Sequence, residues 1–518
     1  MIFFGISGEL WMLNVDRSLS QAYAHEKKGA LEKAEKLYWR ILSVFPQNPR
    51  AKVALQRVWN KNVKLERTPT RATMQKLLEI YKNHDFVSVI NLCDGLLDYY
   101  PKTPIIWNIL GAAQYEMGDF KNACDAFKKV TQLAPEYADG HNNLGNVFRS
   151  TNQLKQAENC YRTAIRLKSN YPEAFNSLGL VVAEGGRLEE AIAAYDAAFD
   201  LRPDYVSAFI RRENLLVQLV PEKLHLLKPY LEQAQKLEHH LAKDPLHQIY
   251  CAVQSFILNN CQRCENHLLK FDALIASGIN LALTSKEKKF CDNYSRFLKL
   301  LVANPEKHDQ FLSRKAYHIG ESHCLSYAHS RIQINSKDFI VYPKIVFGAK
   351  SYHFCKNNNN RFKELAKVNL KAIPNNSTVL LSFGEIDCRH DEGILPSAAK
   401  LCRGLGGLVQ ETVTGYVNWF LEINEENDHE YNFFNVPAPV YNHSLTHELN
   451  CDVALVVNLF NEALKMALKN SSMKIIDVYN LTSDQKGFSN GLFHCDKNHL
   501  GRQILPMLNK PKNRIQKP

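Results

Sequence analysis

A spacing of 34 residues runs through the first half of this chain and constrains its fold more than any other feature. A glycine, an alanine and an aromatic residue each recur at this interval: Gly111, Gly145 and Gly179; Ala123, Ala157 and Ala191; Phe127, Tyr161 and Tyr195. Small residues at fixed positions indicate close contact between two helices, and an aromatic side chain then fills the gap to the next unit. We therefore predict pairs of helices that stack into a solenoid.

The period and these residue types resemble the tetratricopeptide repeat, which is a helix-turn-helix unit. The predicted solenoid covers residues 15–216, with three clear repeats at 104–137, 138–171 and 172–205 and two weaker ones at about 15–48 and 70–103. The resemblance implies a concave surface that binds a protein or a peptide. The first helices of the repeats would present asparagines there: Asn108, Asn142, Asn143, Asn146 and Asn176. The sequence leaves open whether they bind an extended backbone or are only solvated.

Composition limits the classes of function. The 518 residues are 45% apolar and 23% charged, which is ordinary for a globular protein of two or three domains. The net charge of +11 is spread along helices without a basic block that contains aromatic residues, so we predict no nucleic-acid binding. The 13 scattered cysteines are typical of a reducing compartment. The apolar N-terminal segment, residues 1–14, is too short to span a membrane, so we predict a cytoplasmic protein without a membrane span.

Beyond the solenoid, the pattern of the chain changes twice. We predict irregular helices that form a cap or linker over residues 217–312, and a basic tail over residues 509–518. Between them, residues 313–508 alternate strands with helices, which favours a mainly parallel sheet covered on both faces. The expected strands are 316–320, 338–347, 378–383, 431–436 and 474–479, and the expected helices are 324–332, 361–370, 397–423 and 452–468. Residues that directly follow parallel strands gather at one edge of a sheet, where active sites form.

Four short motifs in this region resemble those of the SGNH hydrolases, also called GDSL esterases. Gly320-Glu321-Ser322 stands where the family has Gly-Asp-Ser, and Gly348 stands where it has the glycine of its second block. Gly384-Glu385-Ile386-Asp387 stands for Gly-x-Asn-Asp, and Asp496-Lys497-Asn498-His499 matches Asp-x-x-His. The resemblance implies a three-layer α/β domain of flavodoxin-like type over residues 313–508. It also implies hydrolysis of an ester or transfer of its acyl group.

The implied chemistry needs the residue types that these motifs supply. Serine is a weak nucleophile until a base takes its proton, so His499 would act as the base for Ser322. Asp496 would orient the imidazole and stabilise the imidazolium that forms. The backbone N–H groups of Ser322 and Gly348 are the expected donors to the oxyanion.

The third motif departs from the family, because the side chain of Ile386 cannot donate the hydrogen bond that the family's asparagine gives to the oxyanion. Arg389 is the nearest alternative donor, and its charge would also suit an acidic substrate. We therefore expect Glu385, Asp387 and Arg389 at the oxyanion or substrate site. The sequence equally allows Asp387 and Arg389 to form a buried structural ion pair.

Other reactive residues are predicted to be structural. We expect His323 to point along its helix and away from the Ser322 hydroxyl, and Cys324 to be a core residue. The ligand types near the C-terminus, His494, Cys495, Asp496 and His499, lack a second segment to complete a metal site. The linker histidines, His239, His240 and His247, have no spacing typical of metal ligands. Neither a metal nor a cofactor is predicted.

Two functions are compatible with the sequence. The first is a serine-dependent esterase or O-acyltransferase that acts on a carbohydrate or similar ester, with the repeats binding a protein. The second is a non-catalytic repeat scaffold with a degenerate hydrolase-like domain. The complete set of Ser322, Asp496 and His499 favours the enzyme, whereas Ile386 favours the scaffold.

Overall fold

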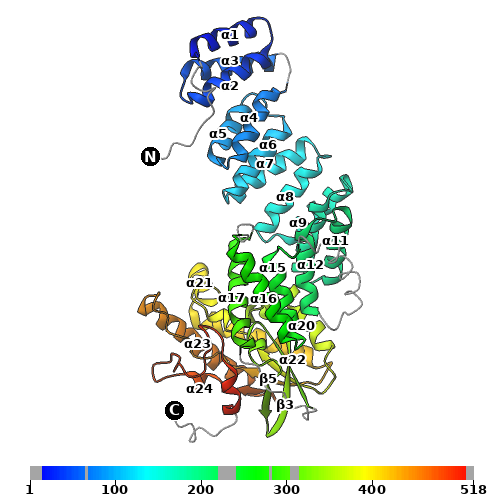
Figure 1. Cartoon of the computed structure of the whole chain (residues 1–518), viewed down its shortest axis with the longest axis vertical. Coiled ribbons are helices and arrows are strands. Elements are labelled where there is room, and N and C mark those ends of the chain that lie inside the picture. Colours follow the sequence, from blue (N-terminus) through cyan, green and yellow to red (C-terminus); the bar gives the residue numbers. More distant parts are fainter. Residues whose placement is uncertain (1–13, 65–67, 220–240, 279–282, 304–313, 509–518) are drawn as a thin grey trace. The chain divides into compact units, whose positions relative to one another are not determined.

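The computed structural model describes residues 14–64, 68–219, 241–278, 283–303 and 314–508, and the chain divides into two compact units, Met1–Val181 and Val182–Pro518 (Figure 1). Nearly all of the predicted N-terminal segment, the basic tail, His239 and His240 lie outside the described residues. Within them, none of the helices combines the length and the apolar composition needed to cross a bilayer.

The first unit is a row of helices joined by short turns. Its helices are α1 (Val15–Lys27), α2 (Leu31–Val44), α3 (Pro49–Lys64), α4 (Arg71–Lys82), α5 (Phe86–Leu97), α6 (Pro104–Glu116), α7 (Phe120–Leu133), α8 (Ala138–Ser150) and α9 (Leu154–Leu167), and α10 (Pro172–Glu184) crosses the unit boundary. Neighbouring repeats contact each other at equivalent positions. The Asn143 amide donates to the Asn108 side-chain oxygen at 3.0 Å, and the hydroxyls of Tyr115 and Ser150 lie 2.8 Å apart. Each pair is separated by 35 residues, about one repeat period.

The repeated glycines are needed because an aromatic ring lies directly against them. A β-carbon at Gly111 would lie 2.9 Å from the ring of Phe127, and one at Gly145 would lie 2.7 Å from the ring of Tyr161. Each aromatic residue thus packs against the glycine of its own repeat, rather than only filling the gap to the next one as predicted. Ala123 and Ala157 are completely buried at the same interfaces between helices.

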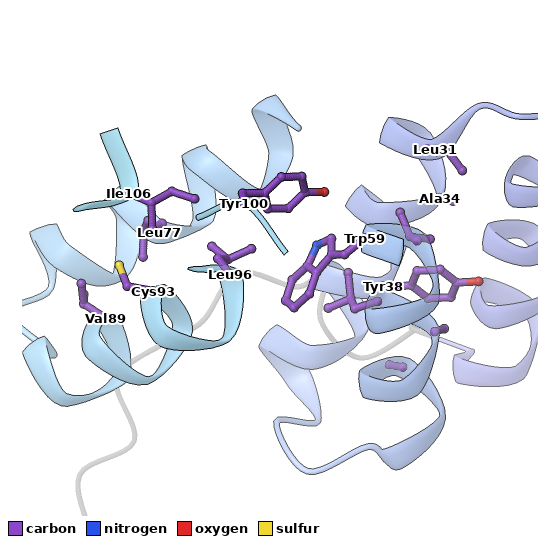
Figure 2. Close-up of a cluster of buried hydrophobic side chains, with 14 of the residues drawn as sticks. Leu31, Ala34, Tyr38, Trp59, Leu77, Val89, Cys93, Leu96, Tyr100 and Ile106 are labelled. Carbon is purple, nitrogen blue, oxygen red and sulfur yellow. The ribbon is translucent and has the colours of Figure 1, made fainter. Parts of the chain in front are cut away.

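The less regular repeats nearest the N-terminus share one apolar core with the first regular repeat, 104–137 (Figure 2). Tyr38 and Trp59 contribute to it from α2 and α3, and Leu96 contributes from α5. Helix α3 was not predicted as part of a repeat. It is held in place because the Trp59 indole donates to the buried Glu35 carboxylate at 2.7 Å.

The second unit begins with helices that belong to the end of the repeats and to the predicted linker. They are α11 (Leu188–Leu201), α12 (Val206–Leu219), α15 (Pro245–Ile257), α16 (Cys261–Ala276) and α17 (Ser285–Val302). Helix α12 packs on α15, and α15 to α17 lie side by side (Figure 1). Helix α17 begins at a capping box in which Thr284 and Glu287 bond each other's backbone N–H groups.

The rest of the second unit contains a six-stranded mixed sheet with the order β2-β3-β1-β4-β5-β6. Its strands are β1 (Lys315–Gly320), β2 (Arg331–Ile334), β3 (Lys337–Ile345), β4 (Thr378–Ser382), β5 (Glu430–Phe434) and β6 (Lys474–Ile476). All neighbouring strands are parallel except β2 and β3, which are antiparallel. The predicted strands are therefore present, within a few residues at each end.

One predicted helix, residues 324–332, is wrong. Only α18 (His323–Ser326) is helical, and the chain then forms β2, which pairs with β3 through a tight hairpin. Asn335 and Ser336 both have positive φ angles, 51° and 62°, as a two-residue hairpin turn requires. The alternation of buried Ile332 and Ile334 with exposed neighbours is the strand signal that was missed.

Apolar side chains cover the sheet on both faces. On one face, Phe433 of β5 packs edge-on against Tyr416 and Phe420 of α22. On the other, Phe434 belongs to a cluster that includes Leu505, near the C-terminal end of the described chain. The helices of this part are α19 (Ser351–Cys355), α20 (Arg361–Lys371), α21 (Ile394–Leu401), α22 (Leu405–Asn424), α23 (His447–Leu468) and α24 (Tyr479–Thr482), with short 3-10 turns η4 (Ile386–Cys388) and η5 (Arg502–Met507).

Candidate active site

Ser322 stands at the carboxyl end of β1, an interior strand of the sheet between β3 and β4. The preceding Gly320 allows β1 and β4 to approach each other, because a β-carbon there would lie 2.3 Å from the Ser382 hydroxyl and 3.0 Å from its carbonyl. The chain passes directly into α18, so Ser322 lies in the turn between the strand and this helix. Only 5% of Ser322 is exposed to solvent.

His499 and Asp496 lie in a loop that an isolated bridge between His494 and Leu500 closes. The Asp496 Oδ1 atom accepts hydrogen bonds from the backbone N–H groups of Asn498 and His499, at 2.8 and 2.7 Å. These bonds fold the four residues into one turn and direct the carboxylate to the imidazole. The three-residue spacing of Asp496 and His499 is therefore what this turn requires.

The three side chains form a continuous row of contacts. His499 Nε2 lies 2.8 Å from the Ser322 Oγ, and His499 Nδ1 lies 2.8 Å from an oxygen of Asp496. Burial raises the pKa of Asp496, but the hydrogen bonds and charge of His499 and the two backbone N–H groups outweigh burial, so its pKa lies below its usual value. The carboxylate is thus ionised and can hold the imidazole in one orientation.

The Ser322 backbone N–H, which was expected to bind the oxyanion, is occupied by the neighbouring side chain. The Glu321 carboxylate accepts hydrogen bonds from both the N–H and the hydroxyl of Ser322. Its other oxygen accepts one from the Tyr294 hydroxyl of α17 at 2.8 Å. Gly348, the second expected donor, lies in an exposed turn after β3 with a φ angle of 68°.

The residues of the third motif separate into two groups. Arg389 donates to both oxygens of Glu385, with the shortest distance 2.6 Å, so it pairs with Glu385 and not with Asp387. Burial raises the pKa of Glu385, but Arg389 and the nearby His323 and His499 outweigh burial and lower it. Glu385 is thus a charged group close to the two histidines.

Asp387 has a structural environment in this fold. Its carboxylate is completely buried and accepts hydrogen bonds from the backbone N–H groups of Ser351 and Tyr352, at 2.6 and 3.3 Å. These bonds anchor the first turn of α19. Burial raises the pKa of Asp387 to about 6. Ile386 beside it is also buried, at 7% exposure.

Helix α17 of the predicted linker covers the histidine, which the sequence interpretation missed. The Phe297 ring stacks on the His499 imidazole, with ring centres 3.8 Å apart and planes 14° from parallel. Phe290, Tyr294 and Phe297 follow one another at intervals of four and three residues, so they lie on one face of the helix. This aromatic face is the signal in the sequence that was not linked to the site.

The neighbours of the three residues are mostly structural. His323 Nε2 donates a hydrogen bond to the Asn498 backbone carbonyl at 2.8 Å, and its ring centre lies 4.9 Å from that of His499. It therefore lies beside the catalytic candidate rather than away from the site, and burial together with His499 lowers its pKa. Cys324 is completely buried, and burial raises the pKa of its thiol.

A cavity of about 240 Å³ lies beside Glu385 and Arg389. Apolar and polar side chains both line it, and Pro437, which follows β5, is among them. Several asparagines border the space, Asn293, Asn442, Asn450 and Asn498, and of these the Asn450 side chain is already bonded to the backbone of Asn442 and Thr446. Uncharged amides of this kind can donate to and accept from hydroxyl groups.

The only group of three ligand-type side chains close enough for a metal ion, within the described part of the chain, is Glu213, His247 and Cys251. The His247 Nδ1 lies 2.8 Å from a Glu213 oxygen. Burial lowers the pKa of His247, but Glu213 and Cys251 outweigh burial and raise it to about 10. With its pKa raised, the imidazole is protonated and forms a buried ion pair with Glu213.

Comparison with known families finds matches within residues 105–205. A model described as TPR repeat matches residues 145–184, and one described as Tetratricopeptide repeat matches residues 105–137 and 172–205. The N-terminal array is built from tetratricopeptide repeats. The two weaker TPR units predicted before residue 104 lie outside the matched residues. TPR proteins bind proteins or peptides, so the TPR array is a protein-interaction scaffold.

Several solved structures are similar to the array. A crystal structure of MamA is 20% identical, covers 35% of this chain and 93% of its own, and has a TM-score of 0.23. The first TPR of Spaghetti (RPAP3), bound to an HSP90 peptide, is 20% identical over 22% of this chain and 89% of its own, with a TM-score of 0.21. PilF of Pseudomonas aeruginosa is 14% identical over 43% and 96%, with a TM-score of 0.35. At these scores the likeness supports no further argument. No curated protein matches the chain.

Proposed function

We propose that residues 313–508 of the second unit form a serine-dependent esterase or O-acyltransferase of SGNH type, and that the TPR array binds a protein or peptide that directs it. The observation that supports the enzyme most is the row of contacts from Ser322 Oγ to His499 Nε2 and from His499 Nδ1 to Asp496, each 2.8 Å long. A serine, a base and an orienting carboxylate in this order are the elements of nucleophilic acyl transfer.

The proposed reaction has two halves. Ser322 Oγ attacks the acyl carbon while His499 Nε2 takes its proton, and Asp496 stabilises the imidazolium. The imidazolium then gives the proton to the leaving alkoxide, which breaks the ester bond and leaves the acyl group on Ser322. In the second half His499 removes a proton from water or from an acceptor hydroxyl, which attacks the acyl-enzyme. Water gives hydrolysis, and an acceptor hydroxyl gives transfer.

The strand order supports the proposed fold type. The parallel strands stand in the order β3-β1-β4-β5-β6, which becomes 2-1-3-4-5 when only these strands are counted along the chain. That is the flavodoxin-like order, in which the site lies where the strand order reverses, between the first strand and its later neighbour. Here those strands are β1 and β4, which lead into Ser322 and Glu385.

The cavity favours a neutral polar substrate such as a carbohydrate ester. Its asparagine amides suit hydroxyl groups, whereas the charge of Arg389 is already balanced by Glu385. The acidic substrate that an unpaired arginine would favour is therefore less well supported. We propose that the cavity binds the sugar or alcohol part of the ester.

The test compares the full-length protein with its Ser322→Ala variant. Covalent labelling by a fluorophosphonate and hydrolysis of an activated acetate ester are both expected for the wild type and absent for the variant. Circular dichroism and thermal unfolding show whether both proteins are folded. Labelling that persists in folded Ser322→Ala would exclude Ser322 as the nucleophile.

A second candidate is a TPR scaffold whose C-terminal domain no longer turns over substrate. Two observations favour it: Ile386 replaces the family's asparagine, and the Ser322 N–H is engaged by Glu321. Under this proposal, neither labelling nor hydrolysis occurs in any folded variant, while a protein partner still binds. Quantitative pull-down with the full chain and with a double Asn108→Ala, Asn143→Ala variant would then test the asparagines of the array.

A further inference from the structure

The Glu321 carboxylate connects the candidate nucleophile to helix α17. It accepts hydrogen bonds from the backbone N–H and the hydroxyl of Ser322 with one oxygen, and from the Tyr294 hydroxyl at 2.8 Å with the other. Glu321 is 9% exposed, and Tyr294 is 5% exposed, so solvent competes little for these bonds. A buried carboxylate with three donors is a strong, charge-assisted contact.

This contact opposes two requirements of the reaction: removal of the Ser322 hydroxyl proton by His499 and stabilisation of the oxyanion by the Ser322 N–H. The Ser322 hydroxyl has one proton, and two acceptors compete for it, since Glu321 binds the same oxygen that lies 2.8 Å from His499 Nε2. The Ser322 N–H is also unable to stabilise an oxyanion while it donates to Glu321. A negative carboxylate at that place would repel the negative charge of the intermediate.

Helix α17 supplies the rest of the cover. Phe297 lies flat on His499 at 3.8 Å, and Ser322 and His499 are each only 5% exposed. At the other end of the helix, the Lys289 ammonium contacts Asp391 at 3.0 Å and Glu392 at 3.1 Å. The helix therefore contacts both the candidate site, through Phe297, and the segment after η4, through Lys289.

We propose that α17 is a lid that keeps the site at low activity through the contact between Tyr294 and Glu321, and that turnover requires Glu321 to leave the Ser322 N–H. This inference rests on the proposed function, because it describes how that same site is regulated. When the carboxylate leaves, the Ser322 hydroxyl can donate its hydrogen bond to His499 Nε2, and the Ser322 N–H can donate to the oxyanion.

The lid is also connected to α12, the helix that follows the last clear TPR repeat. The Gln218 side chain of α12 accepts a hydrogen bond from the Phe347 backbone N–H at 2.8 Å. The Phe347 ring lies against Phe290 and Tyr294 of α17, with ring centres 5.5 and 5.4 Å apart. A displacement of α12 would thus reach Tyr294 through a single residue, which gives the end of the array a direct effect on the lid.

The experiment measures the rate of fluorophosphonate labelling of the full chain. Removal of the carboxylate in Glu321→Ala is expected to raise the rate by about tenfold, the size of one lost charge-assisted hydrogen bond. Tyr294→Phe keeps the ring and removes only the hydroxyl, so a rise of about threefold is expected. Tyr38→Phe is the matched control: its buried hydroxyl also donates to a buried carboxylate, that of Glu26 at 3.2 Å, but it belongs to α2 of the first unit, so no change is expected.

The outcomes separate the two proposals. If the wild type is labelled and both folded variants, Glu321→Ala and Tyr294→Phe, are labelled at the same rate or more slowly, the lid is overturned and the nucleophile assignment stays intact. Complete absence of labelling in the wild type and in both variants would overturn the proposed function, and the lid with it. Tyr294→Phe changes one atom, so it decides the question even if Glu321→Ala does not fold.

Discussion

The contacts inside the TPR array and those inside the second unit join residues at very different separations along the chain. In the array, side chains such as Asn108 and Asn143 meet their partners one repeat away, 35 residues along. In the C-terminal unit, Ser322 and His499 are 177 residues apart and meet only when the whole sheet has formed. The comparison teaches that the array can change locally without losing its architecture, whereas the candidate site depends on every segment between its parts.

The largest expected effect is on the long-range site. Asp496→Asn keeps the shape of the side chain but weakens its hold on the imidazole, so the proposed esterase activity should fall about 1,000- to 10,000-fold. The backbone hydrogen bonds of the turn can still be accepted by the amide oxygen, so thermal stability should change little. Initial rates and melting curves of the same preparation measure both. A loss of activity that only follows a loss of fold would contradict the assigned role.

A local change in the array should lower its free energy of unfolding without changing the site formed by Ser322, His499 and Asp496. The β-carbon of Gly145→Ala would lie 2.7 Å from the Tyr161 ring, so we expect a loss of about 1–3 kcal/mol in the free energy of unfolding. Gly95→Ala is the matched control, because that helical position has no neighbour within 4 Å. It should be neutral or stabilising by about 0.5–1 kcal/mol. Denaturant titration of both variants measures the difference, and equal effects would contradict the packing argument.

The buried Asp387 should make the stability of the second unit depend on pH. Its pKa is raised by burial to about 6 from an ordinary value of 3.8, so the folded state holds the proton over a range in which the unfolded state has lost it. The free energy of unfolding should therefore fall as the pH rises from about 4 through 6, by on the order of 1–3 kcal/mol relative to Asp387→Asn. Urea titrations at several pH values measure this. A stability difference that rises with pH over this range would contradict the direction of the shift.

The smallest expected effect is in the hairpin between β2 and β3. Ser336 has a φ angle of 62°, which costs a serine free energy but not a glycine. Ser336→Gly should therefore stabilise the second unit by a few tenths of a kcal/mol, up to about 1 kcal/mol. The control is Gly487→Ala, where φ is 83° and the reverse change should destabilise. Thermal unfolding of both variants checks the opposite signs.

The fold was more predictable where a pattern repeats. Three copies of a glycine, an alanine and an aromatic residue are enough to locate α6 to α11, because each copy solves the same packing problem. Helix α3 and strand β2 were missed, since neither belongs to a repeating pattern: α3 is held by contacts such as that of Trp59 with Glu35, and β2 by its pairing with β3. The turn at Asn335 and Ser336 was a readable signal that the helix prediction overrode.

In the candidate site, the sequence suggested which residues meet but not what surrounds them. The motifs around Ser322 and His499 suggested that these residues meet, and the structure brings their side chains within 2.8 Å. The pairing of Arg389 with Glu385, rather than with Asp387, depends on which way two neighbouring side chains turn after β4. That choice follows from burial in the folded unit, which spacing along the chain does not encode.

The sequence by itself determined the TPR array, the alternation of strands and helices and the residue types needed for acyl transfer, because each depends on local periodicity or on chemistry that only certain side chains possess. Tertiary structure alone decided that Glu321 occupies the Ser322 N–H and that α17 covers His499. Those contacts join segments whose separation in the chain carries no periodic signal. They arise only when packing of the second unit brings the aromatic face of one helix onto the edge of a sheet.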